Sequence, residues 1–91
     1  MPSYLVETFL ARGRAGERDA CERRARSAAE EQTRAGTRVR FDGAIHIPED
    51  ELCFFVFDAG SSRDAALVAR RAGLEPFRVV EAVSSRKEHH S

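Results

Sequence analysis

The sequence predicts one α+β domain in which strands and helices follow the order strand, helix, strand, strand, helix, strand. Short runs rich in aromatic and β-branched residues, typical of strands, are separated by two stretches rich in alanine and arginine, typical of helices. The 91 residues are enough for one domain and too few for two.

The first half of the chain predicts a strand and a long helix. The strand is expected over residues 4–10, and the glycines at 13 and 16 end it. A helix is expected from Glu17 to about Ala35, because most residues there are strong helix formers. Small side chains recur on one helical face and allow close packing on a sheet: Cys21, Ala25, Ala28, Ala29 and Gln32. Gly36 follows where a helix end favours a left-handed residue.

The middle of the chain predicts two strands joined by a tight turn. The second strand is expected over residues 37–47, with a possible bulge at Gly43. Residues 47–51 have turn chemistry, with Pro48 supplying the fixed φ angle. The third strand, 52–59, is apolar on both sides and is therefore expected in the centre of the sheet.

A second helix and a fourth strand complete the domain. Ser61 and Asp64 resemble a capping box at the start of this helix, and Gly73 marks its end. The last strand is expected over 77–83. We expect residues 1–84 to form the domain and residues 85–91, which are polar, to form a flexible tail.

This order is the split β-α-β repeat, so the predicted architecture is ferredoxin-like (βαββαβ). The right-handed crossover rule gives an antiparallel sheet in the order fourth, first, third, second strand. Both helices then cover one face of the sheet and leave the other face open.

Alternation along each strand assigns side chains to the two faces. The residues expected beneath the helices are Val6, Phe54, Val56, Val80 and Ala82. The residues expected on the open face are Leu5, Glu7, Phe9, Cys53, Phe55, Phe57, Phe77, Val79, Glu81 and Val83. The second strand adds Arg38, Arg40, Asp42, Ala44 and His46, unless the bulge at Gly43 reverses part of that set.

Such an open face is too apolar to meet water alone, which predicts a partner. A second copy of the sheet is the simplest cover, and a small domain has a thin core of its own. We therefore expect a homodimer that resembles a barrel, with an internal cleft.

Two carboxylates are expected in that cleft. Glu7 and Glu81 are assigned to neighbouring strands among apolar side chains, where an unpaired carboxylate is costly to bury. One hypothesis is a paired-carboxylate site for acid–base chemistry or a cation. The alternative is that each carboxylate pairs with an arginine, such as Arg78 or Arg40, or with the backbone of a second subunit. The residues expected to line a ligand pocket are Glu7, Phe55, Phe57, Phe77 and Glu81.

A transition-metal site is a second hypothesis for the same face. Imidazole, thiolate and carboxylate ligands suit nickel, zinc or copper, and the candidates are His46, Cys53, Glu7 and Glu81. The alternatives are a strand-end histidine and a small core cysteine. For His89 and His90 in the tail, the alternatives are adventitious metal binding and a remnant of a tag. No HxH, CxxC or HExxH motif is present.

Composition favours a cytoplasmic protein without nucleic-acid or membrane partners. Lys+Arg and Asp+Glu both total 15, so no overall charge attracts either surface. No run of about 18 apolar residues is present, and residues 1–7 show no secretory signal. The two cysteines, Cys21 and Cys53, are expected to be reduced.

Four segments together resemble a family of small bacterial proteins of unknown function, one branch of which is described as nickel-binding. They are Tyr4–Glu7, Thr33–Arg40, Ile47–Phe54 and Ala72–Val83, and the resemblance covers residues 4–83. It implies a ferredoxin-like fold, a homodimer through the sheet faces and nickel binding in the cytoplasm. It assigns no nickel ligand in this chain.

Three functions follow as hypotheses. The first is a cytosolic dimer that binds a metal ion or a small organic ligand in the cleft. The second is a cofactor-independent enzyme of the monooxygenase, isomerase or cyclase type, with Glu7 or Glu81 as general acid or base for a hydrophobic substrate. The third is a non-catalytic interaction domain.

Overall fold

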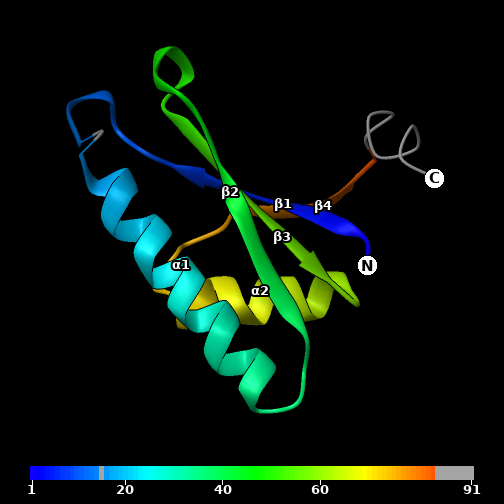
Figure 1. Ribbon diagram of the computed structural model, residues 1–91. Coiled ribbons are helices and arrows are strands. Elements are labelled where there is room, and N and C mark those ends of the chain that lie inside the picture. The colour runs from blue at the N-terminus through cyan, green and yellow to red at the C-terminus, as the bar shows by residue number, and fades with distance from the viewer. Residues whose placement is uncertain (15, 84–91) are drawn as a thin grey trace.

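The computed structural model describes residues 1–14 and 16–83. It contains four strands, two α-helices and two short 3-10 turns: β1 Ser3–Phe9, η1 Arg12–Arg14, α1 Glu17–Arg34, β2 Val39–Ile47, η2 Pro48–Asp50, β3 Leu52–Ala59, α2 Ser62–Arg71 and β4 Arg78–Ala82 (Figure 1). The predicted α+β architecture is confirmed. The polar tail and its two histidines lie outside the described residues.

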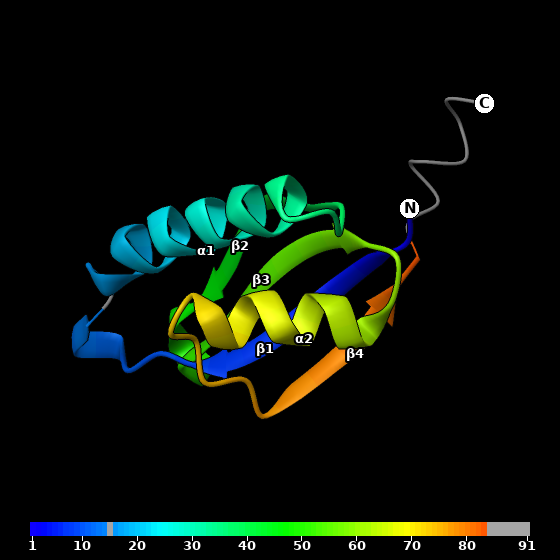
Figure 2. The same cartoon turned by 90° about the horizontal axis from the view of Figure 1, so that it is seen from below.

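The four strands form one antiparallel sheet in the order β2-β3-β1-β4. This is the expected order read from the other edge, and the arrangement is consistent with a ferredoxin-like fold. Both helices lie on the same side of the sheet (Figure 2). No helix of the described residues is long and apolar enough to cross a bilayer.

The core lies between the helices and this covered face. Helix α1 contributes small side chains, among them Ala25 and Ala29, which let the helix approach the sheet closely. Helix α2 adds Val68. The sheet supplies the large residues, of which Phe55 and Phe57 are almost fully buried. Small helical residues against large strand residues therefore fill the core of this domain.

Helix ends follow the chemistry that the sequence predicted. The Ser61 hydroxyl accepts a hydrogen bond from the Asp64 N–H at 3.2 Å and so caps α2. Gly36 and Gly73 follow the two helices with φ of 112° and 80°, where a side chain would be strained.

A β-bulge in β2 decides which side chains reach the open face. The register with β3 shifts between Phe41 and Gly43, and Gly43 has a φ of 124°. After the bulge, Ala44 lies opposite Phe55 and His46 lies opposite Cys53, so both belong to the covered side. Before the bulge, Arg40 lies opposite Asp58 on the open side. The possible reversal at Gly43 is confirmed.

The face assignment of β3 was wrong. Val6 is fully buried beneath the helices, as expected, but its partner on β3 is Phe55. Directly opposed residues share a face, so Cys53, Phe55 and Phe57 belong to the covered side and Phe54 and Val56 to the open side. The physical reason is that β3 is apolar on both sides, and only its register with β1 decides which set the helices cover.

The same correction applies to β4. Val79 lies opposite Val6, and Glu81 opposite Tyr4, so both are on the covered side. Val80 lies opposite Leu5 on the open side, and alternation places Ala82 there too. The structure thus exchanges the two faces of β4 relative to the prediction.

Candidate functional site

The face of the sheet opposite the helices, here called the open face, is the candidate site. Its apolar side chains come from all four strands: Leu5, Phe9, Ile45, Ile47, Leu52, Phe54, Val56, Val80 and Ala82. Phe9 is 61% and Ile45 53% exposed, while the remainder are half-buried. A continuous apolar surface of this kind on a small domain marks an interaction or ligand site.

Glu7 lies within this apolar surface and pairs with Arg78. The two residues are opposed on β1 and β4, and Arg78 Nε donates a hydrogen bond of 3.0 Å to Glu7 Oε1. Glu7 is only 8% exposed, so the ion pair offsets the cost of burying its charge. The alternative in which an arginine neutralises Glu7 is confirmed, with Arg78 as the partner.

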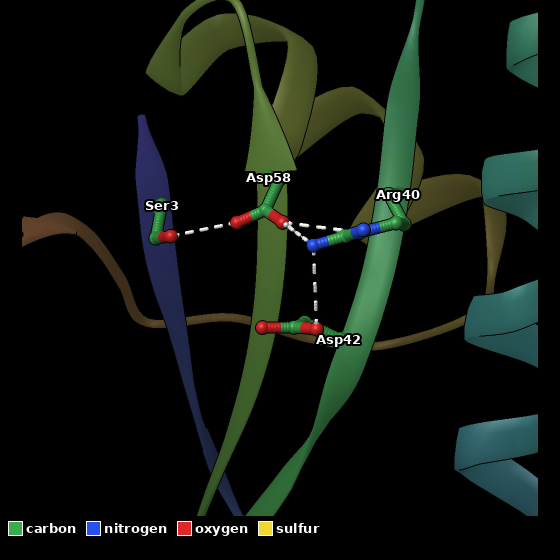
Figure 3. A network of polar contacts seen from close by, with 4 residues as sticks. All are labelled: Ser3, Arg40, Asp42 and Asp58. Atoms are coloured by element: carbon green, nitrogen blue, oxygen red, sulfur yellow. Dashed lines mark hydrogen bonds and ion pairs between the residues drawn. The ribbon is translucent and has the colours of Figure 1, made fainter. Parts of the chain in front are cut away.

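A second polar cluster lies at the end of the open face where β1 begins (Figure 3). Asp58, 5% exposed, accepts a hydrogen bond of 2.6 Å from the Ser3 hydroxyl through Oδ1. Its Oδ2 accepts bonds from Arg40 Nε and Nη2 at 3.1 and 2.7 Å. Asp42 lies 3.7 Å from the same guanidinium.

These contacts fix the Arg40 side chain across the surface of β2 and β3. The hydrogen bond to Asp58, with the charges of Asp58 and Asp42, raises the pKa of Arg40. One guanidinium therefore faces two carboxylates at this end of the face, whereas Arg78 faces one. The open face is an apolar surface whose two buried acids are already neutralised by arginines.

Comparison with known proteins supports the fold and nothing finer. SCO4226 from Streptomyces coelicolor A3(2), known from a crystal structure analysis, is similar to this chain with a TM-score of 0.69. The two are 18% identical, and the match covers 90% of this chain and 98% of that chain. No protein-family model matches the chain, and no curated protein matches it.

The predicted pair of carboxylates is not formed. Glu7 is on the open face, whereas Glu81 is opposite Tyr4 on the covered side of β4. The predicted pocket is divided in the same way, since Phe55 and Phe57 are core residues. Phe77 lies just before β4, 58% exposed, and its N–H donates to the Glu7 carbonyl at 3.0 Å. Of the five predicted pocket residues, the structure places Glu7 alone on a strand of the open face.

The four metal candidates do not fit one site. His46 and Cys53 are opposed on the covered side, Glu7 is on the other side, and Glu81 is on the far edge strand. Within residues 1–14 and 16–83, no three His, Cys, Asp or Glu side chains are placed to hold a metal ion. Burial raises the pKa of the Cys53 thiol to about 11, which keeps it in the form that binds metals poorly.

His46 and Cys53 are the two candidates that the fold does bring together. The Nε2 atom of His46 is buried and has no hydrogen-bond partner in the described part of the chain. An imidazole nitrogen in that position can accept or donate one further bond. The pair supplies two donors, fewer than the four that zinc usually takes.

Sequence reasoning missed Asp58 as a site residue. It shares the alternation of Leu52, Phe54 and Val56, and it is the only charged residue in β3. A charged residue in an otherwise apolar strand marks the set of positions that faces away from the core. That signal was present and would have assigned β3 correctly.

Proposed function

We propose that this chain is a cytosolic ligand-binding protein that acts as a homodimer, with the open face of one copy covering that of another. The observation that carries the proposal is the apolar surface across all four strands, from Ile45 on one edge to Val80 on the other. Two-fold association brings the same patch of both copies together, which suits a face that carries both arginines and carboxylates.

The ligand class follows from the composition of the open face. Leu5, Phe54, Val56 and Val80 would contact an apolar body, because pockets for small organic molecules are mostly apolar with a few polar groups that set orientation. The Glu7–Arg78 pair is the polar group nearest these residues in register. We therefore propose a small hydrophobic ligand with one polar end.

The oligomeric state tests the first half of the proposal. Light scattering on protein purified without a tag is expected to give the mass of a dimer. Phe54→Lys places a charge in the open face and is expected to give a monomer with an unchanged circular dichroism spectrum. Val83→Lys is the matched control, because Val83 is 82% exposed beyond the end of β4, and it should remain a dimer. A wild-type monomer at all concentrations would contradict dimer formation.

Ligand binding tests the second half. Native mass spectrometry of the dimer is expected to reveal a bound small molecule that copurifies with the protein. If none copurifies, added anilinonaphthalene sulfonate is expected to bind with one probe molecule per cleft. Leu5→Trp, which fills space on the open face, should reduce probe binding while the dimer persists. A dimer that binds no probe and carries no copurified molecule would favour the third hypothesis, a non-catalytic interaction domain.

Binding of nickel or another divalent transition metal is a second, narrower proposal. Its support is the buried His46 Nε2 opposite Cys53. Metal analysis after nickel titration, on protein without its C-terminal histidines, is the test. Binding that is unchanged by His46→Ala and Cys53→Ala together would remove this pair as the site.

A cofactor-independent enzyme of the monooxygenase, isomerase or cyclase type would rely on Glu7 alone. Glu81 is on the other side of the sheet and cannot share a substrate with it. We favour binding over catalysis for this reason. Turnover of a hydrophobic substrate by the wild type and its loss in Glu7→Gln would reverse that preference.

A further inference from the structure

A cavity of about 330 Å³ lies at one end of the covered side of the sheet, and Phe9 at the end of β1 is the lining residue that it shares with the open face. It is bounded by the start of α1, the end of β1 and the turn that joins α2 to β4. Its wall includes both cysteines of the chain and several charged groups: Arg14, Glu17, Cys21, Arg24, Cys53 and Glu75. Its volume is at the lower end of the range for small-molecule pockets, roughly 300–1,000 Å³.

Cys21 lies in this wall beside a fixed positive charge. The Arg24 guanidinium donates from Nη2 to the Cys21 sulfur at 3.3 Å and from Nε to the Ala72 carbonyl at 2.8 Å. The second bond anchors the guanidinium to the end of α2, so its position does not depend on the thiol. Cys21 itself is partly exposed, which leaves its sulfur open to a molecule in the cavity.

Arg24 has no carboxylate partner among the described residues, unlike the other arginine of the cavity. Arg14 lies 2.8 Å from Glu17, and this ion pair neutralises both charges. No carboxylate of the described residues therefore forms an ion pair with Arg24, although Glu75 in the same wall carries an opposing charge. The Arg24 guanidinium is the positive group in contact with the Cys21 sulfur, and it can also meet an anionic group that enters the cavity. Reactive cysteines in proteins are found in such partly exposed, electropositive surroundings, because the thiolate is the nucleophile.

Cys53 lines the same cavity but in a different environment. It is fully buried, and its sulfur has no hydrogen-bond partner within the residues that the structure describes. Burial, with a smaller contribution from the nearby Cys21, raises the pKa of Cys53 to about 11. At neutral pH Cys53 is a thiol, so it neither competes with Cys21 for an electrophile nor readily displaces a group bound to Cys21.

We propose that Cys21 is a modification site for small anionic disulfides, with this cavity as the binding site and Arg24 as the group that attracts them. The Cys21 thiolate attacks one sulfur of the disulfide and forms a new protein–ligand disulfide bond. The other half of the small disulfide leaves as a thiolate and takes a proton from solvent. A low-molecular-weight disulfide with carboxylates, such as glutathione disulfide, has the required charge.

Mass spectrometry after incubation of the full chain with glutathione disulfide tests this site. We expect one added glutathionyl group on the wild type and on Cys53→Ala, and none on Cys21→Ser. Peptide mapping should place the group on Cys21. An adduct on Cys53, or an adduct that survives Cys21→Ser, would overturn the proposal.

The role of Arg24 has a matched control on the same helix. Arg24→Gln is expected to slow the reaction with glutathione disulfide about 5-fold, because one charge close to the sulfur is lost. Arg23→Gln removes an exposed arginine that does not line this cavity and should leave the rate unchanged. Arg24→Lys keeps the charge and should restore most of the rate.

Disulfides of opposite charge distinguish electrostatic attraction by Arg24 from simple accessibility of the Cys21 thiol. For each protein, the rate with glutathione disulfide is divided by the rate with the cationic disulfide cystamine. This ratio should be higher for the folded wild type than for the same protein unfolded in urea. That preference should vanish in Arg24→Gln. Equal effects of Arg24→Gln and Arg23→Gln, or a reaction no faster in the folded than in the unfolded protein, would refute the proposed site. Neither result bears on the open face, which is on the other side of the sheet.

Discussion

Arg78 on β4 lies opposite Glu7 on β1, and its guanidinium donates a hydrogen bond of 3.0 Å to the Glu7 carboxylate among the apolar side chains of the open face. The contact explains how a carboxylate that is 8% exposed is tolerated there. It also couples the two residues, since removal of Arg78 leaves the nearly buried Glu7 carboxylate without its charged partner, whereas the Arg78 side chain is 64% exposed and stays hydrated.

This interdependence predicts the result of a double-mutant cycle. Arg78→Gln is expected to lower the free energy of unfolding by about 1–2 kcal/mol, because Glu7 loses its charged partner while staying mostly buried. Adding Glu7→Gln should recover part of that loss, since two neutral amides need no ion pair. Urea denaturation of the four proteins measures the coupling. Strictly additive effects would show that the contact contributes nothing to stability.

The Asp58 cluster gives a second prediction, based on burial rather than on distance alone. Asp58→Asn is expected to lower the free energy of unfolding by about 2 kcal/mol, because a buried acceptor of charge-assisted hydrogen bonds is lost. Asp42→Asn is the control: Asp42 is exposed and 3.7 Å from Arg40, and exposed ion pairs contribute little. Thermal or urea unfolding compares the two. Equal losses would mean that the burial of Asp58 does not matter.

Residue periodicity predicted the elements of this fold and the two faces of β1, but not which face of β3 and β4 meets the helices. Alanine-rich helices, capping residues and terminal glycines act locally, so Ser61, Gly36 and Gly73 could be placed from the sequence. The faces of β3 and β4 depend on register, which is set by contacts between distant residues such as Val6 and Phe55. In β3 the two faces are almost equally apolar, and Asp58 is the one residue of the strand whose charge distinguishes them.

The site residues were likewise predicted correctly where alternation is clear and wrongly where register or a bulge decides the face. Glu7 was assigned correctly because Val6 lies beneath the helices as expected and neighbouring residues of a strand point to opposite faces. Its pairing with an arginine was one of the expected outcomes. Glu81 was misplaced because β4 carries valine on both faces, and the paired-carboxylate hypothesis depended on it. His46 moved to the covered side because of a bulge, whose position only the glycine hinted at.

The bulge itself can be tested. Gly43→Ala is expected to destabilise the protein by about 1–3 kcal/mol, because a φ of 124° is a conformation that residues with a Cβ rarely adopt. No atom lies within 4 Å of the added Cβ, so the cost would come from backbone strain and not from a clash. Gly13→Ala, also without neighbours within 4 Å and free of a positive φ, should change the unfolding midpoint little. A Gly43→Ala protein as stable as wild type would argue against this backbone geometry.

The buried thiol of Cys53 predicts a pH dependence of stability in the alkaline range. Burial raises its pKa from 9.0 to about 11, so the unfolded chain loses this proton at a lower pH than the folded protein does. The free energy of unfolding is unaffected by this group below pH 9 and decreases as the pH rises from 9 toward 11, by up to about 2–3 kcal/mol.

Cys53→Ala removes the group, and the stability of this variant is expected to fall less over the same pH interval, whatever its stability at neutral pH. Urea unfolding of both proteins between pH 8 and about 11, with Cys21→Ser as the control that retains the buried thiol, measures the difference in slope. Parallel curves for wild type and Cys53→Ala would mean that the thiol is as accessible to ionisation in the folded protein as in the unfolded chain, and the inertness assigned to Cys53 in the cavity would then be wrong.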